Sequence, residues 1–269
     1  MFSEAVARFL KDRTASLAHK TETEYNRQSV TLIKAFGRVA LDKITPAHVY
    51  RYLEARGRTV AATREKALLS AVFNHARMVG LTNATNPCAG VRGVGSRRDR
   101  LVSDAELAAA LAGAKDDFPL AAFLELAYRT GQRPSDVLRM TRADVQDGAL
   151  RVRQAKTGRQ VRIIVEGALA ALVERLTKDT VGSIRLVRDE KGQPLTLTAM
   201  RKRWSAVRTT IGADWQLRDL RPKGATDSAD VASARALLGH SDEATTAAIY
   251  RRVGELAKPV NREIAGSKS

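Results

Sequence analysis

NPCAGVRGVGSRRDR, residues 86–100, is the stretch at which the chain changes its organisation. It combines a proline, several glycines and several arginines without hydrophobic periodicity, whereas apolar residues on both sides recur with a period of about 3.6. Such a stretch is typical of a linker between domains. The sequence therefore predicts a first domain over residues 1–88, a basic linker over 89–100 and a second domain over 101–269.

The arginines of this linker have two readings. A basic loop can be simply solvated, or it can lie as a strap along a nucleic-acid backbone. The arginine density favours the strap, so we interpret Arg97, Arg98 and Arg100 as candidate DNA contacts.

The first domain is predicted to be all-helical, because its apolar side chains recur on one face of each segment. Caps and glycines mark the segment ends. The expected helices begin at Ser3, at the capping-box pair Thr21 and Glu24, at Thr45 and at Ala62, and the last three end at Gly37, Gly57 and Val79.

The second domain is predicted to be mostly helical with one small antiparallel sheet. The period changes to two after Gly148, which indicates a hairpin that turns at residues 156–159. The other expected elements are a helix after the capping box Ser103 and Glu106, a helix over 118–130 that ends at Gly131, a short helix from Ser135, and helices near 168–177 and 199–211. The fold class is therefore mainly α.

The composition indicates a basic protein that attracts polyanions. Lys and Arg outnumber Asp and Glu by 46 to 29, which gives a formal net charge of +17. The single cysteine, Cys88, fits a reducing compartment, and no apolar run approaches the ~18 residues of a membrane helix. The four histidines lack metal-ligand spacing. We expect a cytoplasmic protein without metal, cofactor or membrane contact.

Five elements of the second domain occur in an order that resembles the tyrosine recombinases, also called the phage integrase family. Each motif alone is weak, and the order carries the resemblance. They are TGQRPSDVL (residues 130–138), Lys156 in AKTGR, RDLR (residues 218–221), LLGH (residues 237–240) and Tyr250 in IYRR.

The resemblance implies a metal-free site for cleaving a phosphodiester. Arginine stays charged and offers a rigid fork of donors, so it suits the negative charge of the transition state. The implied roles are phosphate binding by Arg133, Arg218 and Arg221, a further donor at Lys223, proton delivery to the leaving oxygen by Lys156, hydrogen bonding or proton uptake by His240, and nucleophilic attack by Tyr250.

Each of these residues also has a structural interpretation. Arg133 can be a helix-start arginine paired with Asp136, Lys156 a solvated turn residue, and His240 a helix-capping side chain. Tyr250 on an amphipathic helix can serve packing alone.

The sequence departs from the family pattern in three ways that matter for activity. The segment between Arg221 and His240 is shorter than in the commonest members. Arg218 stands where most relatives have histidine, so a base at that position is lost. Tyr250 follows His240 by ten residues rather than the commoner nine, and one extra residue in a continuous helix would rotate its side chain by ~100°.

The predicted function is a site-specific DNA recombinase or integrase that works through a covalent 3′-phosphotyrosine, and that integrates a prophage or another mobile element. The alternative is a degenerate integrase that only binds DNA, and a type IB topoisomerase is a third possibility. Trapping a 3′-phosphotyrosine on nicked duplex separates the first two.

The resemblance also implies the partners. We expect double-stranded DNA at attachment sites, a homotetramer on synapsed DNA, a monomer or weak oligomer when free, and DNA-bending accessory proteins. A bacterial, nucleoid-associated location follows from that role. The chain resembles a phage-type integrase without an arm-binding domain.

Overall fold

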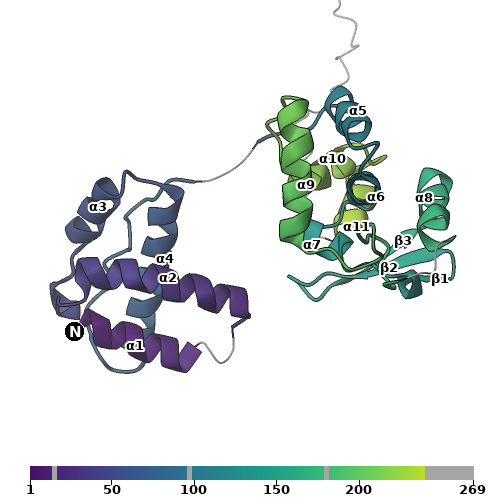
Figure 1. The fold of residues 1–269 in the computed structure, drawn as a ribbon. Coiled ribbons are helices and arrows are strands. Elements are labelled where there is room, and N and C mark those ends of the chain that lie inside the picture. The colour runs from purple at the N-terminus through teal and green to yellow at the C-terminus, as the bar shows by residue number, and fades with distance from the viewer. Residues whose placement is uncertain (14–16, 96–98, 179–181, 240–269) are drawn as a thin grey trace, which may run out of the picture. The chain divides into compact units, whose positions relative to one another are not determined.

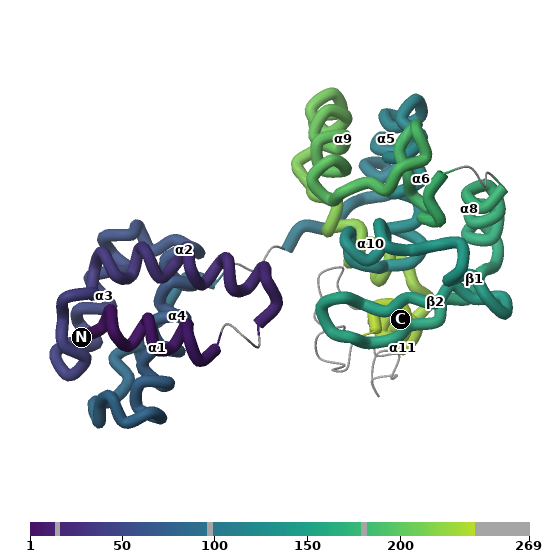
Figure 2. The backbone as a smooth tube through the Cα atoms, turned by 60° about the horizontal axis from the view of Figure 1, so that its bottom comes forward, coloured from purple at the N-terminus to yellow at the C-terminus, as the bar shows by residue number. Residues whose placement is uncertain are grey.

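The computed structural model describes residues 1–13, 17–95, 99–178 and 182–239. The chain divides into two compact units, Met1–Arg98 and Asp99–Ser269. Figure 1 shows both units as ribbons, and Figure 2 shows the same backbone as a tube. Each unit has a hydrophobic core of its own, so each is described by itself.

The first unit is a set of helices around one core. Its α4 packs against α1, α2 and α3, and α1 also runs beside α2 (Figure 2). Phe2 and Phe73 are completely buried between these helices. The described elements are α1 (Phe2–Arg13), α2 (His19–Phe36), the short 3-10 turn η2 (Leu41–Lys43), α3 (Pro46–Ala55) and α4 (Val60–Met78).

Three of the predicted helix starts in the first unit are wrong. The fourth helix begins at Val60 rather than at Ala62, because Thr59 caps it. The first helix begins at Phe2 rather than after Ser3, because burying the Phe2 ring outweighs capping by a serine hydroxyl. The second begins at His19, so Thr21 lies inside its first turn and cannot cap it. Thr21 and Glu24 therefore form no capping box. By contrast, Thr45 caps α3 as expected.

A buried carboxylate joins α3 to α4. Glu65 is fully buried and accepts a hydrogen bond from the Tyr52 hydroxyl at 2.7 Å and two from Arg56 at 2.8 and 3.1 Å. Burial raises the pKa of Glu65, but the hydrogen bonds from Arg56 and Tyr52 outweigh it, so this pKa lies below its usual range. The pairing connects the two helices through buried polar contacts.

The second unit is mostly helical, as the sequence predicts. The central helix α6, of which most side chains are buried, lies between α5, α8, α9 and α10 (Figure 1). Its start and end agree with the prediction. The helices are α5 (Asp104–Gly113), α6 (Phe118–Thr130), α7 (Pro134–Val137), α8 (Gly167–Lys178), α9 (Leu197–Thr210), α10 (Leu220–Thr226) and α11 (Val231–Leu238), with the 3-10 turns η3 (Arg142–Asp144) and η4 (Leu217–Asp219).

The predicted hairpin is confirmed as part of an antiparallel sheet in the order β1-β2-β3. β2 (Ala149–Arg153) pairs with β3 (Gln160–Ile164), and the two-residue β1 (Val145–Gln146), which the sequence analysis did not predict, pairs with β2. Leu150 faces Ile163 on the buried side, whereas Arg151 faces Arg162 on the exposed side. Buried and exposed side chains therefore alternate along these strands, as the sequence predicts.

The close crossing of α6 and α10 depends on one glycine. A Cβ on Gly224 would lie 2.3 Å from the backbone oxygen of Tyr128, a distance that no side chain can occupy without moving one of the helices. Gly224 therefore allows α10, which carries Arg221, to lie directly against α6.

We expect Gly224→Ala to destabilise the second unit by about 1–3 kcal/mol, the usual cost of overpacking. Thermal unfolding of the purified protein would measure the loss. Gly95→Ala is the matched control, because a Cβ there meets nothing within 4 Å and its φ is unstrained. Equal melting temperatures for the two variants would contradict this account of the crossing.

Candidate active site

The loop between α6 and α7 carries the first predicted arginine. α6 ends at Gly131, whose φ of 59° is in the left-handed region, and a Cβ there would lie 3.2 Å from Leu237. Gln132 then turns inward and is buried, whereas Arg133 keeps a quarter of its side chain exposed. The tight turn thus points two neighbouring side chains to different places.

Arg133 contacts both a glutamine and the expected aspartate. Its Nη1 donates to Gln154 Oε1 at 2.8 Å and forms a longer ion pair of 3.9 Å with Asp136 Oδ2. Asp136 is buried and uses Oδ1 to accept from the Ala155 amide and from Arg139, both at 3.0 Å. Its Oδ2 has no hydrogen-bond partner in the described ranges.

The second predicted arginine, Arg221, lies on α10 close to the first. Its Nη1 donates to the Gly131 carbonyl at 2.6 Å and its Nη2 to the Leu238 carbonyl at 2.7 Å. Burial, followed by repulsion from the charge of Arg133, lowers the pKa of Arg221 to about 10, against an opposing effect of Asp136. The structure therefore brings the two arginines to one place, where Arg221 donates to the Leu238 carbonyl and Arg133 is linked to the same carbonyl through Gln154.

Lys156 and Arg218 are exposed at the edges of this area. Lys156 lies in the turn between β2 and β3, whose base is closed by the Gln154 amide donating to the Arg159 carbonyl at 2.8 Å. Arg218 lies in η4 and lines a depression of about 290 Å³ together with Arg201 and Arg208 of α9. Both positions leave the charged ends open to solvent.

The end of α11 reaches the same place from the other side. The helix ends at Gly239, again with a left-handed φ of 62°. The carbonyls of Leu237 and Leu238 point at the site, where they accept from Gln132 Nε2 and Gln154 Nε2 at 2.7 and 2.8 Å. His240 and Tyr250 lie outside the described residues.

Sequence reasoning missed the two glutamines that connect these elements. Gln132 and Gln154 are both buried, and Gln154 Nε2 donates to Gln132 Oε1 at 2.8 Å. The sequence does carry a signal for Gln154. Side chains along β2 alternate between inward and outward, and Gln154 is the next inward position after Leu150 and Val152. A polar residue at an inward position next to a proposed site is a candidate for that site.

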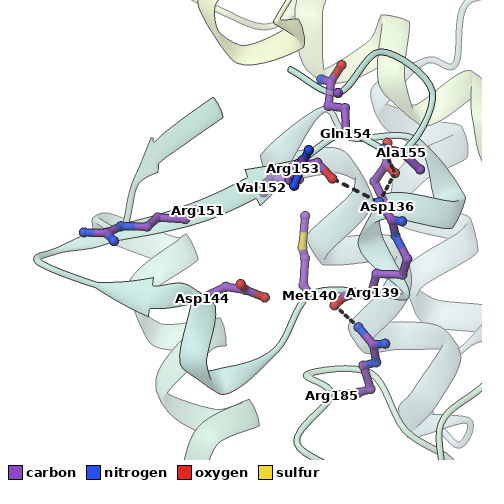
Figure 3. A pocket seen from close by; sticks show the side chains of 11 residues that line it. Asp136, Arg139, Met140, Asp144, Arg151, Val152, Arg153, Gln154, Ala155 and Arg185 are labelled. Carbon is purple, nitrogen blue, oxygen red and sulfur yellow. Dashed lines mark hydrogen bonds and ion pairs between the residues drawn. The ribbon is translucent and has the colours of Figure 1, made fainter. Parts of the chain in front are cut away.

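A basic depression of about 500 Å³ opens beside β2 (Figure 3). Figure 3 shows Arg153 in its middle, Arg139 and Arg185 on one side, and Gln154 at its edge, with the amide pointing away from Asp144. Arg139 Nη2 donates to the Arg153 carbonyl at 3.0 Å, and Arg185 donates to the Arg139 carbonyl. The depression therefore adjoins the Arg133–Gln154 contact and carries more positive than negative side chains.

The four predicted DNA-contact residues differ in what the structure shows of them. Arg97 and Arg98 lie outside the described residues. Arg100 is paired with Glu106 and Asp214 instead of extending from a linker. Lys223 is buried, and its ammonium donates to Asp104 and Asp227. These contacts give Arg100 and Lys223 structural roles. Each residue has one partner nearby in sequence, Glu106 or Asp227, and one distant partner, Asp214 or Asp104, which sequence could not indicate.

With this geometry in place, the comparisons with known proteins decide the family. The profile of the Phage integrase family matches residues 103–256, and the profile of the Phage integrase central domain matches residues 2–94. The chain belongs to the phage integrase family. It is a tyrosine recombinase, and the matched range includes the positions of His240 and Tyr250.

The curated relatives of this integrase-family chain are phage integrases. The integrase of Enterobacteria phage 434 is 27% identical over 254 residues, which cover 87% of this chain and 71% of the relative. The integrase of Escherichia phage lambda is 27% identical over 256 residues, with the same coverage of 87% and 71%.

Solved integrases share the fold. A lambda integrase dimer bound to a COC′ core site superposes with a TM-score of 0.81 at 22% identity, over 97% of this chain and 80% of that one. A lambda integrase tetramer bound to a Holliday junction superposes with a TM-score of 0.82 at 20% identity, over 96% of this chain and 79% of that one. The Tn1549 transposon integrase in complex with a circular intermediate DNA superposes with a TM-score of 0.77 at 14% identity, over 93% of this chain and 95% of that one.

The described residues show neither a metal-binding cluster nor a membrane-spanning helix. No group of three or more His, Cys, Asp or Glu side chains in these ranges is arranged to hold a metal ion. Likewise, no helix within them is long and apolar enough to cross a bilayer.

The position of Lys223 gives a prediction that separates a structural role from a DNA contact. Burial lowers its pKa, but the hydrogen bonds and charges of Asp104 and Asp227 outweigh it, so this pKa lies above its usual value. Lys223→Met should therefore lower the free energy of unfolding by about 1–3 kcal/mol through loss of a buried pair. Chemical denaturation measures this change.

Lys202→Met on the exposed side of α9 is the control and should change stability by less than about 0.5 kcal/mol. If Lys223→Met keeps full stability but weakens DNA binding, the original interpretation of Lys223 as a DNA contact is right.

Proposed function

We propose that this chain recombines specific DNA sites through a covalent tyrosine intermediate. The Tyr250 oxygen attacks the scissile phosphorus and forms a 3′-phosphotyrosine. The bond from phosphorus to the 5′ oxygen breaks, and its electron pair leaves with that oxygen. A 5′-hydroxyl from a second strand then attacks the phosphotyrosine, which restores a phosphodiester and releases Tyr250.

The observation that carries this proposal is the pairing of Arg133 with Arg221. Arg221 donates to the Leu238 carbonyl, and Arg133 reaches the same carbonyl through Gln154, so that the charge of Arg133 lowers the pKa of Arg221. A phosphate between them relieves the repulsion and accepts their hydrogen bonds. Because extra charge develops on the phosphate oxygens in the transition state, donors fixed in advance stabilise that state most.

The other residues complete the proton transfers. Lys156 at the hairpin turn donates a proton to the leaving 5′ oxygen, and His240 hydrogen-bonds the phosphate or takes the phenol proton. Arg218 donates to a phosphate oxygen in place of the histidine of most relatives, and this guanidinium cannot act as a base. Of these three residues, His240 is therefore the one that can take the phenol proton.

The relatives suggest how the chain assembles. The solved lambda integrases are a dimer on a core site and a tetramer on a Holliday junction. We infer the same for this chain: it binds double-stranded attachment sites and forms a tetramer when two sites synapse. Its place of action is then the bacterial cytoplasm, at the nucleoid. Integration of a prophage or another mobile element is the biological outcome.

Tyr250→Phe tests the chemistry directly. It removes only the attacking oxygen and keeps the ring, so DNA affinity and melting temperature should stay near wild type while the covalent adduct disappears. The assay uses a suicide duplex with the bound site, mapped beforehand by footprinting, and a denaturing gel.

Arg133→Ala and Arg221→Ala should each slow adduct formation by about 10²–10³. Arg175→Ala on α8, where the arginine pairs with Glu125, is the control and should react as wild type. An adduct from Tyr250→Phe would mean that another residue is the nucleophile. If wild type forms no adduct on its mapped site, the chain is a DNA-binding integrase that has lost catalysis.

We also propose that the basic depression beside β2 holds phosphates of the same DNA. Arg153 and Arg185 lie there next to the Arg133–Gln154 contact. Each phosphate contact releases counterions on binding, so log affinity should fall linearly with log salt. Arg153→Gln and Arg185→Gln should each reduce that slope by about one, across all DNA sequences.

Fluorescence anisotropy over a range of salt concentrations measures the slope, with Arg175→Gln as the control. A slope equal to wild type in both variants would exclude the depression from the DNA interface.

A further inference from the structure

Gln154 is a buried amide at a position that strand alternation assigns to the core. It follows Leu150 and Val152 on the inward side of the hairpin, and it is fully buried. A buried polar group without partners costs about 1–3 kcal/mol. Its presence at this position therefore requires a set of hydrogen bonds that an apolar residue could not make.

All four hydrogen-bonding positions of this amide are used. Nε2 donates to the Leu238 carbonyl and to Gln132 Oε1, each at 2.8 Å. Oε1 accepts from Arg133 Nη1 at 2.8 Å and from the Thr157 hydroxyl at 2.9 Å. A primary amide offers two protons and two lone pairs, so Gln154 has no remaining capacity for a substrate.

The chemistry of the partners fixes the orientation of the amide. A carbonyl oxygen only accepts and a guanidinium only donates, so Nε2 must face Leu238 and Oε1 must face Arg133. Exchanging the two ends would place oxygen against oxygen and nitrogen against nitrogen. The amide thus has a single low-energy orientation.

This orientation links the two arginines of the proposed site. Arg133 is bonded to Gln154, Gln154 to the Leu238 carbonyl, and the same carbonyl to Arg221 Nη2 at 2.7 Å. Three hydrogen bonds therefore connect two cations that repel each other. Without the amide, Arg133 would lose the bond that holds it on the side of Arg221.

Gln154 also anchors the hairpin that carries Lys156. The backbone N–H of Gln154 donates to the Arg159 carbonyl, and the backbone carbonyl of Gln154 accepts from the Gly158 N–H, each at 2.8 Å. The side-chain contact with Thr157 reaches the residue next to Lys156. One residue thus holds both an arginine and the base of the lysine-bearing turn.

We propose that Gln154 is a positioning residue that sets the separation of the Arg133 and Arg221 guanidiniums before DNA binds. It touches no reacting atom and acts through Arg133 and through the Leu238 carbonyl. The inference rests on the proposed function, because the separation matters only if both arginines grip one phosphate. A misplacement of about 1 Å costs up to about 10²-fold in rate.

Gln154→Met tests the proposal, because methionine has a similar length and makes none of the four hydrogen bonds. The single-turnover rate of adduct formation at saturating DNA should fall about 10- to 100-fold. The dissociation constant for the mapped site should stay within about threefold of wild type, since the phosphate contacts elsewhere supply most of the affinity. The readout is thus a rate that changes while binding does not.

Gln154→Glu is the second variant, for the case in which methionine prevents folding. A carboxylate keeps the shape of the side chain and can still accept from Arg133 and Thr157. It has no N–H, so it cannot donate to the Leu238 carbonyl or to Gln132. It should slow the adduct by at least about tenfold. Gln28→Met, which removes another buried glutamine, from α2, should leave the rate unchanged.

The outcomes distinguish a failure of the proposed function from a failure of the positioning role of Gln154. No adduct from wild type means that the proposed function has failed, and this inference fails with it. A wild-type adduct with unchanged rates in folded Gln154→Met and Gln154→Glu overturns the positioning role alone. Equal losses of rate and affinity, together with a lower melting temperature, also overturn it, because they indicate a purely structural residue.

Discussion

Two positive charges held close together are the constraint on which the second unit depends. Burial and the charge of Arg133 lower the pKa of Arg221 to about 10, so the close approach of the two arginines has an electrostatic cost. The fold meets this cost with oriented neutral groups, the carbonyls of Gly131 and Leu238 and the amide of Gln154, and with the buried carboxylate of Asp136. The neutral acceptors orient the guanidiniums without removing their charge.

The secondary structure serves this arrangement through tight turns. α6 and α11 both end on a glycine in the left-handed conformation, so their last carbonyls are available to the site. Gly224 lets α10 approach the backbone of α6 closely. These three glycines bring elements far apart in sequence to one place. The site is thus assembled by backbone geometry first and completed by side chains.

The sequence could predict features that depend on local residues. The helix over 118–130 with its terminal Gly131, the capping box at Ser103 and the hairpin are local signals, and the structure agrees with them. Contacts between residues far apart along the chain could not be predicted from the sequence. Nothing near Lys223 in sequence indicates Asp104, and nothing near Gln154 indicates Leu238. The order of motifs identified the arginines as a group, whereas the amide between them became visible only through its contacts.

The Leu238 carbonyl oxygen is shared by two side chains from different elements. Gln154 Nε2 and Arg221 Nη2 both donate to it, at 2.8 and 2.7 Å. Residues that share a hydrogen-bonding partner are energetically coupled, so substitutions at Gln154 and Arg221 are not independent of each other. The end of the hairpin and the start of α10 therefore behave as one thermodynamic unit, although about 65 residues separate them along the chain.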